Sequence, residues 1–551
     1  MKRKLLPLMS VLLVAAASLA GGLRDRAAHH TTPAQDTERQ ELQSDFQDAI
    51  LTIQSNYAGT PDIEGVGKDA IEEMLRTLDP HSNYFTKSEF DELQSEEHSR
   101  FYGIGVSIKK IYNRVFVVAT DPGGPAYRAG LRYGDSVLAI DGQDCVQWSS
   151  EQVMERVRGE VGESVAVTVE RPGIPKPITV SVVRDEIKLP SVRLSFMIGQ
   201  SDTAYIGLTG GFSSKTDEEL TEALAQLKEQ GMRQLILDLR NNPGGLLDQA
   251  IKVAEKFLPA EKKILEVRSR QDPTPYVYAS RENNEPETMP MVILINRRTA
   301  SASEVVAGAL QDHSRAFIVG ETSFGKGLVQ TIFNLWGGTG LTLTTQRYYT
   351  PSGRSIQRDY SNMSFYDYYW NRHDGSANGS DDKKGQPFYT DLGQQVYGGG
   401  GITPNELVKS PEVSSTTAKL YDGAFYFVRQ LVTGQINGLH EYHIPGMQYK
   451  TRLNDADLNK YPVNDKVIAA FRIYLNELPQ FSVPEDKFQA NTDYIRSTIR
   501  KEVITAAYGE EAGEEVFLTG DDFQVKKAID ALPEARLLAK NALGASVSDH
   551  Q

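Results

Sequence analysis

The chain has 551 residues, of which 40% are hydrophobic and 24% charged, and its formal net charge is −14. This length allows several domains with well-filled cores, and the acidic balance without a basic patch excludes an electrostatic basis for nucleic-acid binding. The single cysteine excludes an internal disulfide bond, and no Cys/His cluster has the spacing of metal ligands. The sequence therefore implies neither a metal nor an organic cofactor.

The first residues have the pattern of an export signal. A basic Lys2-Arg3-Lys4 segment precedes an apolar stretch from Leu5 to Ala20 that ends in small residues. This order of segments is typical of a secretory signal peptide. We therefore predict a signal peptide over residues 1–20 and a periplasmic or exported mature protein. Retention of the segment as a membrane anchor is the alternative.

Residues 21–98 are predicted to form an N-terminal helical region. Apolar residues recur there at helical spacing: Phe46, Ile50 and Ile53, then Ile71, Met74 and Leu75. The region also contains a Leu-Asp-Pro-His-Ser segment with His81. We interpret His81, like His313, as structural rather than catalytic.

Residues 99–185 resemble a PDZ domain. The glycine-rich segment from Tyr102 to Val106 matches the carboxylate-binding loop, and the segment from Gly124 to Gly142 matches the core that supports it. Glycines let consecutive backbone N–H groups point at a terminal carboxylate, while the adjacent strand pairs with the peptide main chain. A short helix over residues 149–158 is expected to form one apolar side of the groove. The predicted peptide-binding residues are Tyr102, Gly103, Ile104, Gly105, Val106, Val153 and Val157. A purely structural module is the alternative.

Residues 186–410 are predicted to form an α/β core with largely parallel strands. Buried strand patterns, including 234–239 and Met291–Ile295, are each followed by a helical pattern, as in successive strand–helix–strand units. The Thr216-Asp-Glu-Glu219 segment predicts a capping box at the start of one of these helices. Residues 328–335 and 341–348 flank a glycine-rich turn and predict a hairpin.

A candidate nucleophile lies where one of these strands gives way to a helix. The architecture places Ser301 at a strand-to-helix turn, where free backbone N–H groups and the positive end of the helix dipole gather. A serine there can attack a carbonyl while the amide of Ala302 stabilises the oxyanion. On the residues alone, Ser301 is also a good helix cap, and Ser303 is a competing nucleophile.

Lys326, between two glycines in an apolar neighbourhood, is a candidate general base. A base lysine must be largely neutral near pH 7, so desolvation must lower its pKa from about 10.4 to roughly 7–8. A solvated surface charge is the alternative. The segment from Gly320 to Gly327 also nearly spells a phosphate-binding P-loop, but position 327 lacks the required hydroxyl and a strand pattern follows. We therefore reject nucleotide binding.

These segments together resemble the C-terminal processing, or tail-specific, proteases, which are serine peptidases with a Ser-Lys dyad. The signature combines a Ser/Thr-Ala-Ser-Ala-Ser-Glu block, here residues 299–304, with Phe-Gly-Lys-Gly-x-Val-Gln, here residues 324–330. The resemblance covers roughly residues 79–404 and implies the fold shared with Clp-type proteases and crotonases. It implies these roles: Ser301 as nucleophile, Lys326 as general base, Gln330 as the group orienting the lysine, and the amides of Ala302 and of Gly244 or Gly245 as oxyanion donors. In some family members the N-terminal region pairs two subunits, so the resemblance also implies a homodimer.

Residues 411–551 are predicted to be helical and carry no chemical motif. The expected helices cover residues 418–432, 467–478, 486–508 and 522–543, and a lid, a partner surface and added core are all compatible with them. The function that the whole sequence predicts is an exported serine endopeptidase that binds substrate C-terminal tails through its PDZ domain. A non-catalytic PDZ adaptor on an inactive protease fold is one alternative, and an acyl-CoA enzyme on the crotonase fold is another.

Overall fold

The computed structural model describes residues 33–97, 100–272, 274–361, 363–369, 386–450 and 453–542. The predicted signal peptide, residues 1–20, lies outside the described residues. Within the described ranges, no helix has both the length and the apolar character needed to cross a membrane.

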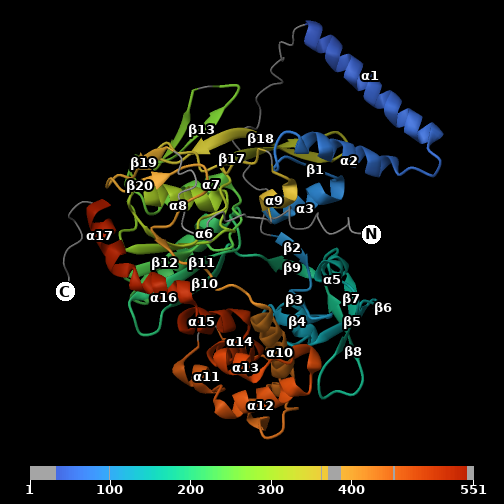
Figure 1. Cartoon of the computed structure of the whole chain (residues 1–551), viewed down its shortest axis with the longest axis vertical. Coiled ribbons are helices and arrows are strands. Elements are labelled where there is room, and N and C mark those ends of the chain that lie inside the picture. The colour runs from blue at the N-terminus through green and yellow to red at the C-terminus, as the bar shows by residue number, and fades with distance from the viewer. Residues whose placement is uncertain are drawn as a thin grey trace.

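The centre of the molecule is a twisted sheet in which β10 is antiparallel to β11 and all further neighbours are parallel (Figure 1). In spatial order its strands are β10 (Val192–Met197), β11 (Thr203–Leu208), β12 (Gln234–Asp238), β15 (Met291–Ile295), β16 (Phe317–Gly320) and β21 (Glu406–Leu407). Every residue of β12 and β15 is buried, as expected for parallel strands covered on both faces. The predicted largely parallel α/β core is therefore confirmed.

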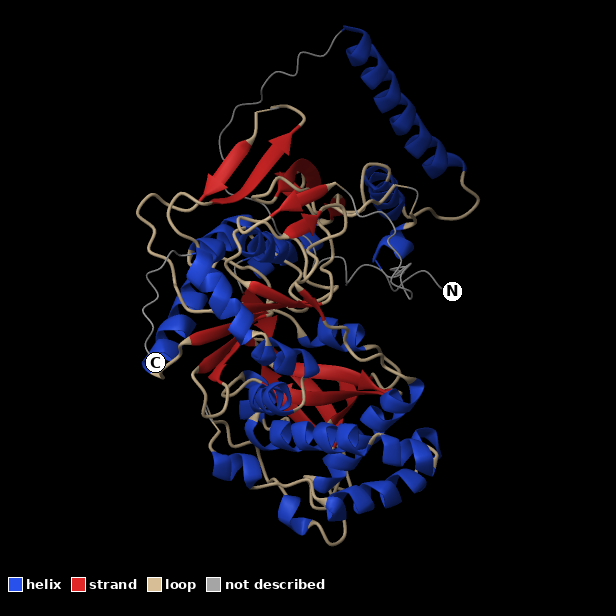
Figure 2. Ribbon diagram, turned by 60° about the vertical axis from the view of Figure 1, so that its left-hand side comes forward, coloured by secondary structure: helices blue, strands red, loops and turns tan. Residues whose placement is uncertain are grey.

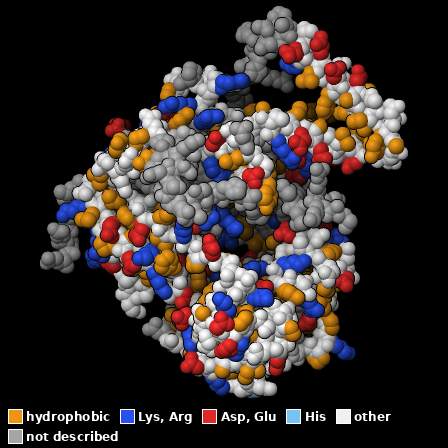
Figure 3. All heavy atoms as spheres, viewed as in Figure 1, with side chains coloured by type: hydrophobic (Ala, Val, Ile, Leu, Met, Phe, Trp, Pro, Cys, Tyr) orange, Lys and Arg blue, Asp and Glu red, His pale blue; other side chains and the backbone are white. Residues whose placement is uncertain are grey.

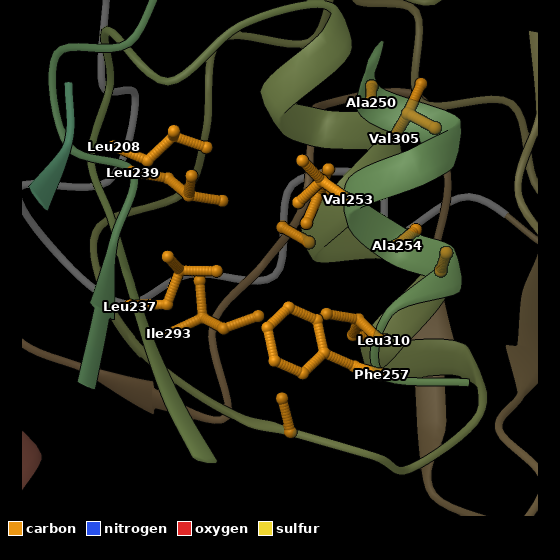
Figure 4. Close-up of a cluster of buried hydrophobic side chains, with 14 of the residues drawn as sticks. Leu208, Leu237, Leu239, Ala250, Val253, Ala254, Phe257, Ile293, Val305 and Leu310 are labelled. Atoms are coloured by element: carbon orange, nitrogen blue, oxygen red, sulfur yellow. The ribbon is translucent and has the colours of Figure 1, made fainter. Parts of the chain in front are cut away.

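Helices cover both faces of this sheet. On one face lie α6 (Thr216–Glu229), α7 (Leu247–Glu255) and α8 (Ala302–Asp312). Figure 4 shows their side chains, among them Val253 and Leu310, meeting Leu237 and Ile293 of the strands. On the other face lie two helices from the end of the chain, α16 (Phe523–Asp530) and α17 (Leu532–Ala542). The last part of the chain thus completes the core.

The predicted capping box at Thr216 is wrong. Helix α6 already begins at Thr216, and no side chain caps it from the preceding residue. The Thr216 hydroxyl instead meets the Ser191 hydroxyl at 2.6 Å, and the Glu219 carboxylate accepts the N–H of Ser191 at 2.7 Å. Both side chains therefore form hydrogen bonds with Ser191, just before β10, rather than capping their own helix.

A second sheet lies beside the core and is largely antiparallel. Its strands are β1 (Asn83–Phe85), β13 (Lys263–Ser269), β14 (Tyr276–Ala279), β17 (Leu328–Asn334) and β18 (Gly340–Tyr349). The predicted hairpin is confirmed, because β17 pairs antiparallel with β18. β1 comes from the N-terminal region and pairs with the same β18, which brings that region to the second sheet. The remaining short elements are α9 (Phe365–Tyr369), β19 (Pro387–Tyr389) and β20 (Gln395–Tyr397).

The segment that resembles a PDZ domain forms its own sheet, with strand order β3-β4-β5-β7-β8 and β6 on β5. Its elements are β3 (Val106–Ile111), β4 (Arg114–Thr120), α4 (Pro125–Ala129), β5 (Ser136–Ile140), β6 (Gln143–Asp144), α5 (Ser150–Val157), β7 (Ser164–Glu170) and β8 (Ile178–Val183). Two further strands, β2 (Arg100–Gly103) and β9 (Asp185–Lys188), pair with each other where the chain enters and leaves this module. We call residues 100–188 the PDZ-like domain.

Most C-terminal helices gather next to the PDZ-like domain (Figures 1 and 2). They are α10 (Ser415–Leu431), α11 (Asp455–Asn459), α12 (Asp465–Asn476), α13 (Glu485–Ala490), α14 (Thr492–Tyr508) and α15 (Glu510–Gly520). The Arg429 Nε donates to the carbonyl of Gly134 at 2.9 Å, and the Tyr133 hydroxyl donates to Glu502 at 2.6 Å. These helices therefore fasten the PDZ-like domain, while α16 and α17 cover the core.

The N-terminal region begins with α1 (Pro33–Asn56), which projects away from the rest of the molecule, and continues with α2 (Ile63–Arg76) and α3 (Lys87–Glu97) (Figure 1). Figure 3 shows hydrophobic side chains along α1, and Leu42 is 69% exposed. The predicted homodimer through this region stays a prediction.

Candidate active site

Ser301 lies at the turn between β15 and α8, as predicted. The chain leaves the buried strand at Ile295, and the helix begins at Ala302. Ser301 has φ 54° and ψ −118°, a combination that costs a non-glycine residue on the order of 1–3 kcal/mol. Ser301 is also the N-cap of α8, with Glu304 as its capping-box partner, so the capping alternative is confirmed as a local role. An ordinary capping serine has an extended backbone, so capping alone does not account for this conformation.

The Glu304 carboxylate holds the serine and lysine segments together. It accepts the N–H of Ser301 at 2.9 Å, of Gly325 at 2.7 Å and of Lys326 at 2.8 Å, and it also accepts the Ser323 hydroxyl. Glu304 is fully buried, and desolvation raises its pKa although these hydrogen bonds oppose the shift. One buried acceptor thus fixes the backbone on both sides of the site.

A second bridge comes from β18. The Tyr348 hydroxyl lies 3.1 Å from the carbonyl oxygen of Ser301 and 2.6 Å from that of Lys326. Burial raises its pKa well above the usual value, so the phenol stays protonated and can donate. The two segments are therefore joined through their N–H groups by Glu304 and through their carbonyls by Tyr348.

Lys326 is 1% exposed, which decides against the alternative of a solvated surface charge. Burial lowers its pKa from 10.5 to about 8, with the Asp79 and Glu304 charges opposing the shift. An amine with this pKa is partly neutral near pH 7 and can accept a proton.

Gln330 follows on β17 and is also buried. Its Nε2 donates to the Thr344 hydroxyl at 3.1 Å, while its Oε1 has no hydrogen-bond partner among the described residues. A buried, unpaired carbonyl oxygen is costly and is therefore open to a donor such as an ammonium group. The orienting role of Gln330 stays a prediction.

The hydroxyl of Ser303, the competing candidate nucleophile, already donates a hydrogen bond to the backbone. Its side chain is fully buried, and its Oγ donates to the carbonyl of Asn242 at 3.1 Å. That bond joins the turn after β12 to the start of α8, so the role of Ser303 is structural.

The glycine turn after β12 lies directly against the candidate nucleophile, Ser301. A Cβ on Gly244 would come within 2.7 Å of the Ser301 Cβ and 3.0 Å of the Ala302 nitrogen, so only glycine fits there. The Gly244 N–H already donates to the Asn242 Oδ1 at 2.9 Å. Among the residues that the structure describes, neither the Ala302 N–H nor the Gly245 N–H has a hydrogen-bond acceptor. Of the two glycines, Gly245 is therefore the better candidate for an oxyanion donor.

The sequence assigned no role to Asp79, which lies near this site. Its carboxylate accepts the N–H groups of His81 and Ser82 and the Ser82 hydroxyl, each at 2.8 Å. The Ser82 Oγ in turn accepts the N–H of Thr344, the partner of Gln330, at 3.2 Å. The Asp-Pro-His-Ser segment thus braces the strand beside the site. Its position in the chain, more than 200 residues before Ser301, gave no hint of this contact.

A cavity of about 990 Å³ adjoins the PDZ-like domain. Of the predicted groove residues, Ile104, Gly105, Val106 and Val157 line it, whereas Tyr102, Gly103 and Val153 do not. Val153 instead packs inside the domain, and its neighbour Met154 faces the cavity. The residues of α5 that face the groove are therefore Met154 and Val157, and the prediction of Val153 is wrong.

The cavity also reaches the other parts of the molecule. Arg240 and Asn241, at the start of the glycine turn, line it, as do Glu510 and Glu511 of α15. Arg240 is held by Asp522 of the C-terminal region at 2.9 Å. The groove is therefore continuous with the loop that precedes the candidate oxyanion donor.

Glu304→Gln tests how far this buried carboxylate organises the site. The amide has only one accepting oxygen for four donors, and its own NH₂ faces donors. We expect the free energy of unfolding to fall by about 2–4 kcal/mol, because charged hydrogen bonds are lost and buried donors are left unpaired. Thermal melting with an exposed control, Glu218→Gln on α6, measures the loss. An unchanged melting temperature would contradict the organising role.

Comparison with known proteins identifies two families in the chain. Peptidase family S41 matches residues 202–361, and the PDZ domain family matches residues 116–171. The carboxy-terminal-processing protease of Bartonella bacilliformis is 35% identical over 351 residues, which are 63% of this chain and 80% of that protein. The carboxyl-terminal-processing protease of Synechocystis sp. is 40% identical over 296 residues, covering 52% of this chain and 68% of that protein. Among solved structures, a photosystem II D1 C-terminal processing protease is 30% identical, covers 57% of this chain and 89% of its own, and has a TM-score of 0.34.

Proposed function

Because the chain belongs to peptidase family S41, with carboxy-terminal-processing proteases as its relatives, we propose that it is an exported endopeptidase with Ser301 and Lys326 as its catalytic dyad. It binds substrates by their C-terminal tails. The observation that carries this proposal is the joining of the Ser301 and Lys326 segments by Glu304 and Tyr348 around a buried lysine with a pKa of about 8.

The proposed reaction is acyl transfer to serine and then to water. Neutral Lys326 accepts the hydroxyl proton while the Ser301 Oγ attacks the peptide carbonyl. The amides of Ala302 and Gly245 stabilise the oxyanion, and Gln330 orients the amine. The lysine then delivers its proton to the leaving amine, which releases the C-terminal product. Water, activated by the same lysine, hydrolyses the acyl-enzyme and restores both groups.

The proposed tail site is the groove between β3 and α5. Gly105, with φ 68°, stands at the loop where a terminal carboxylate would meet backbone N–H groups. The tail would extend the sheet along β3, and its apolar side chains would lie against Met154 and Val157. Continuity of this cavity with Asn241 supports a path from the groove toward the catalytic serine.

Export and dimerisation belong to the same proposal. The basic and apolar segments of residues 1–20 support export, with membrane anchoring if the segment is retained. The projecting helix α1, with exposed Leu42 and Leu51, supports pairing of two copies through the N-terminal region.

Tail recognition is tested with two peptides that differ only at the C-terminus, one a free carboxylate and one an amide. We expect kcat/KM to fall by about tenfold or more for the amide, mainly through KM, because charge-assisted hydrogen bonds are lost. Met154→Glu should remove this preference by placing a charge in the groove. Glu155→Gln, on the exposed side of the same helix, should retain it. Equal cleavage of both peptides by the unaltered protein would contradict tail recognition.

A further inference from the structure

An aromatic cluster lies beside the candidate catalytic lysine. The aromatic cluster consists of His81, Phe324, Tyr368 and Tyr369. His81 comes from the N-terminal region, Phe324 from the lysine loop (residues 321–327, between β16 and β17), and the two tyrosines from α9. His81 makes edge-to-face contacts with all three other rings, at centroid distances of 5.3 Å to Tyr368, 5.9 Å to Tyr369 and 6.4 Å to Phe324. The imidazole is only 1% exposed.

The hydrogen bonds around His81 fix where its proton lies. The Tyr369 hydroxyl donates to the carbonyl of Pro80 at 2.8 Å, so it can only accept from the His81 Nδ1, 3.0 Å away. Nδ1 therefore carries the hydrogen. In the neutral ring Nε2 is then an acceptor, and the Tyr368 hydroxyl donates to it at 2.9 Å. Both ring nitrogens are satisfied in one tautomer.

This arrangement is connected to the lysine loop. The Gln357 Nε2 donates to the Tyr368 hydroxyl at 3.2 Å, while its Oε1 accepts the N–H of Gly327 at 2.8 Å. The Arg358 guanidinium lies 4.6 Å from the Phe324 ring centre and 4.4 Å from that of Tyr368. Phe324 and Gly327, on the two sides of Lys326, thus contact Arg358 and Gln357. Both of these residues also contact Tyr368, which binds the imidazole.

The charged groups near His81 and Lys326 have opposite effects on the pKa values of these two side chains. Burial lowers the pKa of His81 well below its usual value, and the charges of Lys326 and Arg358 lower it further. The Asp79 and Glu304 carboxylates favour a charged Lys326, whereas Tyr348, Tyr368 and Tyr369 are phenols with raised pKa values that stay neutral. At neutral pH the imidazole is an uncharged group held by two tyrosines, and the Lys326 charge is close enough to act on it.

We propose that His81 is a positioning residue for Lys326, a neutral imidazole locked in its Nδ1–H tautomer that keeps water from the amine and ties the N-terminal region to the catalytic base. This inference rests on the proposed function, since it assigns His81 a role through the dyad lysine. Without the ring, water would enter and solvate the ammonium form. The lysine would then be protonated at neutral pH and less able to act as a base.

The pH dependence of kcat in His81→Asn tests this role. The shorter side chain leaves room for water beside the lysine. We expect the acid limb to move up by about one pH unit, so activity at pH 7 falls about tenfold and recovers at about pH 9.5, with KM unchanged. Tyr369→Phe, which removes the Nδ1–H acceptor, should shift the limb in the same direction. Tyr366→Phe, exposed on the same helix, should not. A uniform fall at every pH, or a change confined to KM, would overturn the proposal.

A second measurement does not depend on turnover. In the full chain labelled with ¹⁵N-histidine, with the His81 signals assigned from their contacts to the Tyr368 and Tyr369 rings, we expect the His81 ring to stay in the neutral Nδ1–H form well below the ordinary histidine pKa. An Nε2–H tautomer, or protonation near the ordinary histidine pKa, would overturn the assignment even if His81→Asn misfolds. Should Ser301→Ala retain activity, the proposed function fails instead. An unmoved acid limb beside an inactive Ser301→Ala overturns only the role of His81.

Discussion

Ser301→Ala is expected to abolish peptide cleavage while leaving tail binding intact. Removing the nucleophile of a serine peptidase lowers kcat by about 10⁴- to 10⁶-fold, and the oxyanion donors alone give only residual catalysis. The substitution removes one oxygen from a side chain that is 3% exposed, and the Glu304 bond to the Ser301 N–H does not depend on that oxygen. The measurement is cleavage of an unfolded test protein with an apolar C-terminus, beside calorimetric binding of its tail peptide.

Ser303→Ala is the matched control for that experiment. It also removes a hydroxyl from the first turn of α8, but this hydroxyl donates to the carbonyl of Asn242. We expect a loss of about 1 kcal/mol in the free energy of unfolding and activity within a few-fold of the parent. The opposite ranking, with Ser303→Ala inactive and Ser301→Ala active, would exchange their roles. Loss of tail binding in Ser301→Ala would remove the distinction between the enzyme and an adaptor.

Lys326→Met is expected to inactivate the enzyme and at the same time stabilise the fold. Loss of a general base lowers kcat by about 10²- to 10⁴-fold. The stabilisation follows from burial, which lowers the pKa of Lys326 from 10.5 to about 8 and so opposes folding by about 3 kcal/mol while the lysine is charged. Methionine has a similar length without the charge, so the free energy of unfolding at pH 7 should rise by about 2–3 kcal/mol.

The pH dependence gives the sign of this effect. The folded chain releases the Lys326 proton at about pH 8, and the unfolded chain releases it only near 10.5. Between these values the unfolded state binds more protons, so the stability of the parent rises with pH. The advantage of Lys326→Met should be largest below about pH 8 and disappear near about pH 10.5. Denaturant unfolding at several pH values measures it. A methionine variant that is less stable than the parent at pH 7 would contradict a net cost of burying this lysine.

The sequence was most informative where motif and local structure coincide. Ser301 was placed correctly at a strand-to-helix turn because the apolar run of β15 and the Ala/Val/Leu-rich helix α8 are strong periodic signals. The strand pattern after Gly327, which was the ground for rejecting a P-loop, is confirmed, since β17 rather than a helix follows Gly327. Burial of Lys326 was an expectation from its apolar neighbours, and the fold provides it.

The C-terminal region shows where local signals fail. The helix expected over 486–508 is interrupted at Asn491, whose Nδ2 donates to the carbonyl of Lys487, and the one expected over 522–543 is interrupted before Pro533. Helix α15 was missed, because its glycines have low helix propensity. A Cβ on Gly513 would lie 2.0 Å from the Thr505 Oγ1, so close packing on α14 explains the glycine.

Long-range contacts account for what the sequence could not predict at the site. Asp79 and His81 come near the Lys326 segment because β1 pairs with β18, and the tyrosines of α9 pack on His81. The wall that α15 adds to the groove depends on the C-terminal helices docking on the PDZ-like domain. None of these contacts leaves a periodic or spacing signal in the chain.

The most direct test of the Ser301–Lys326 mechanism is acylation by a peptidyl p-nitrophenyl ester, quenched in acid and mapped by mass spectrometry. The mechanism predicts a burst of about one p-nitrophenol per chain and an acyl group on the Ser301 hydroxyl. It also predicts that Lys326→Met loses the burst at neutral pH. An acyl group on Ser303 or another residue, or hydrolysis by the parent with no covalent intermediate, would contradict it.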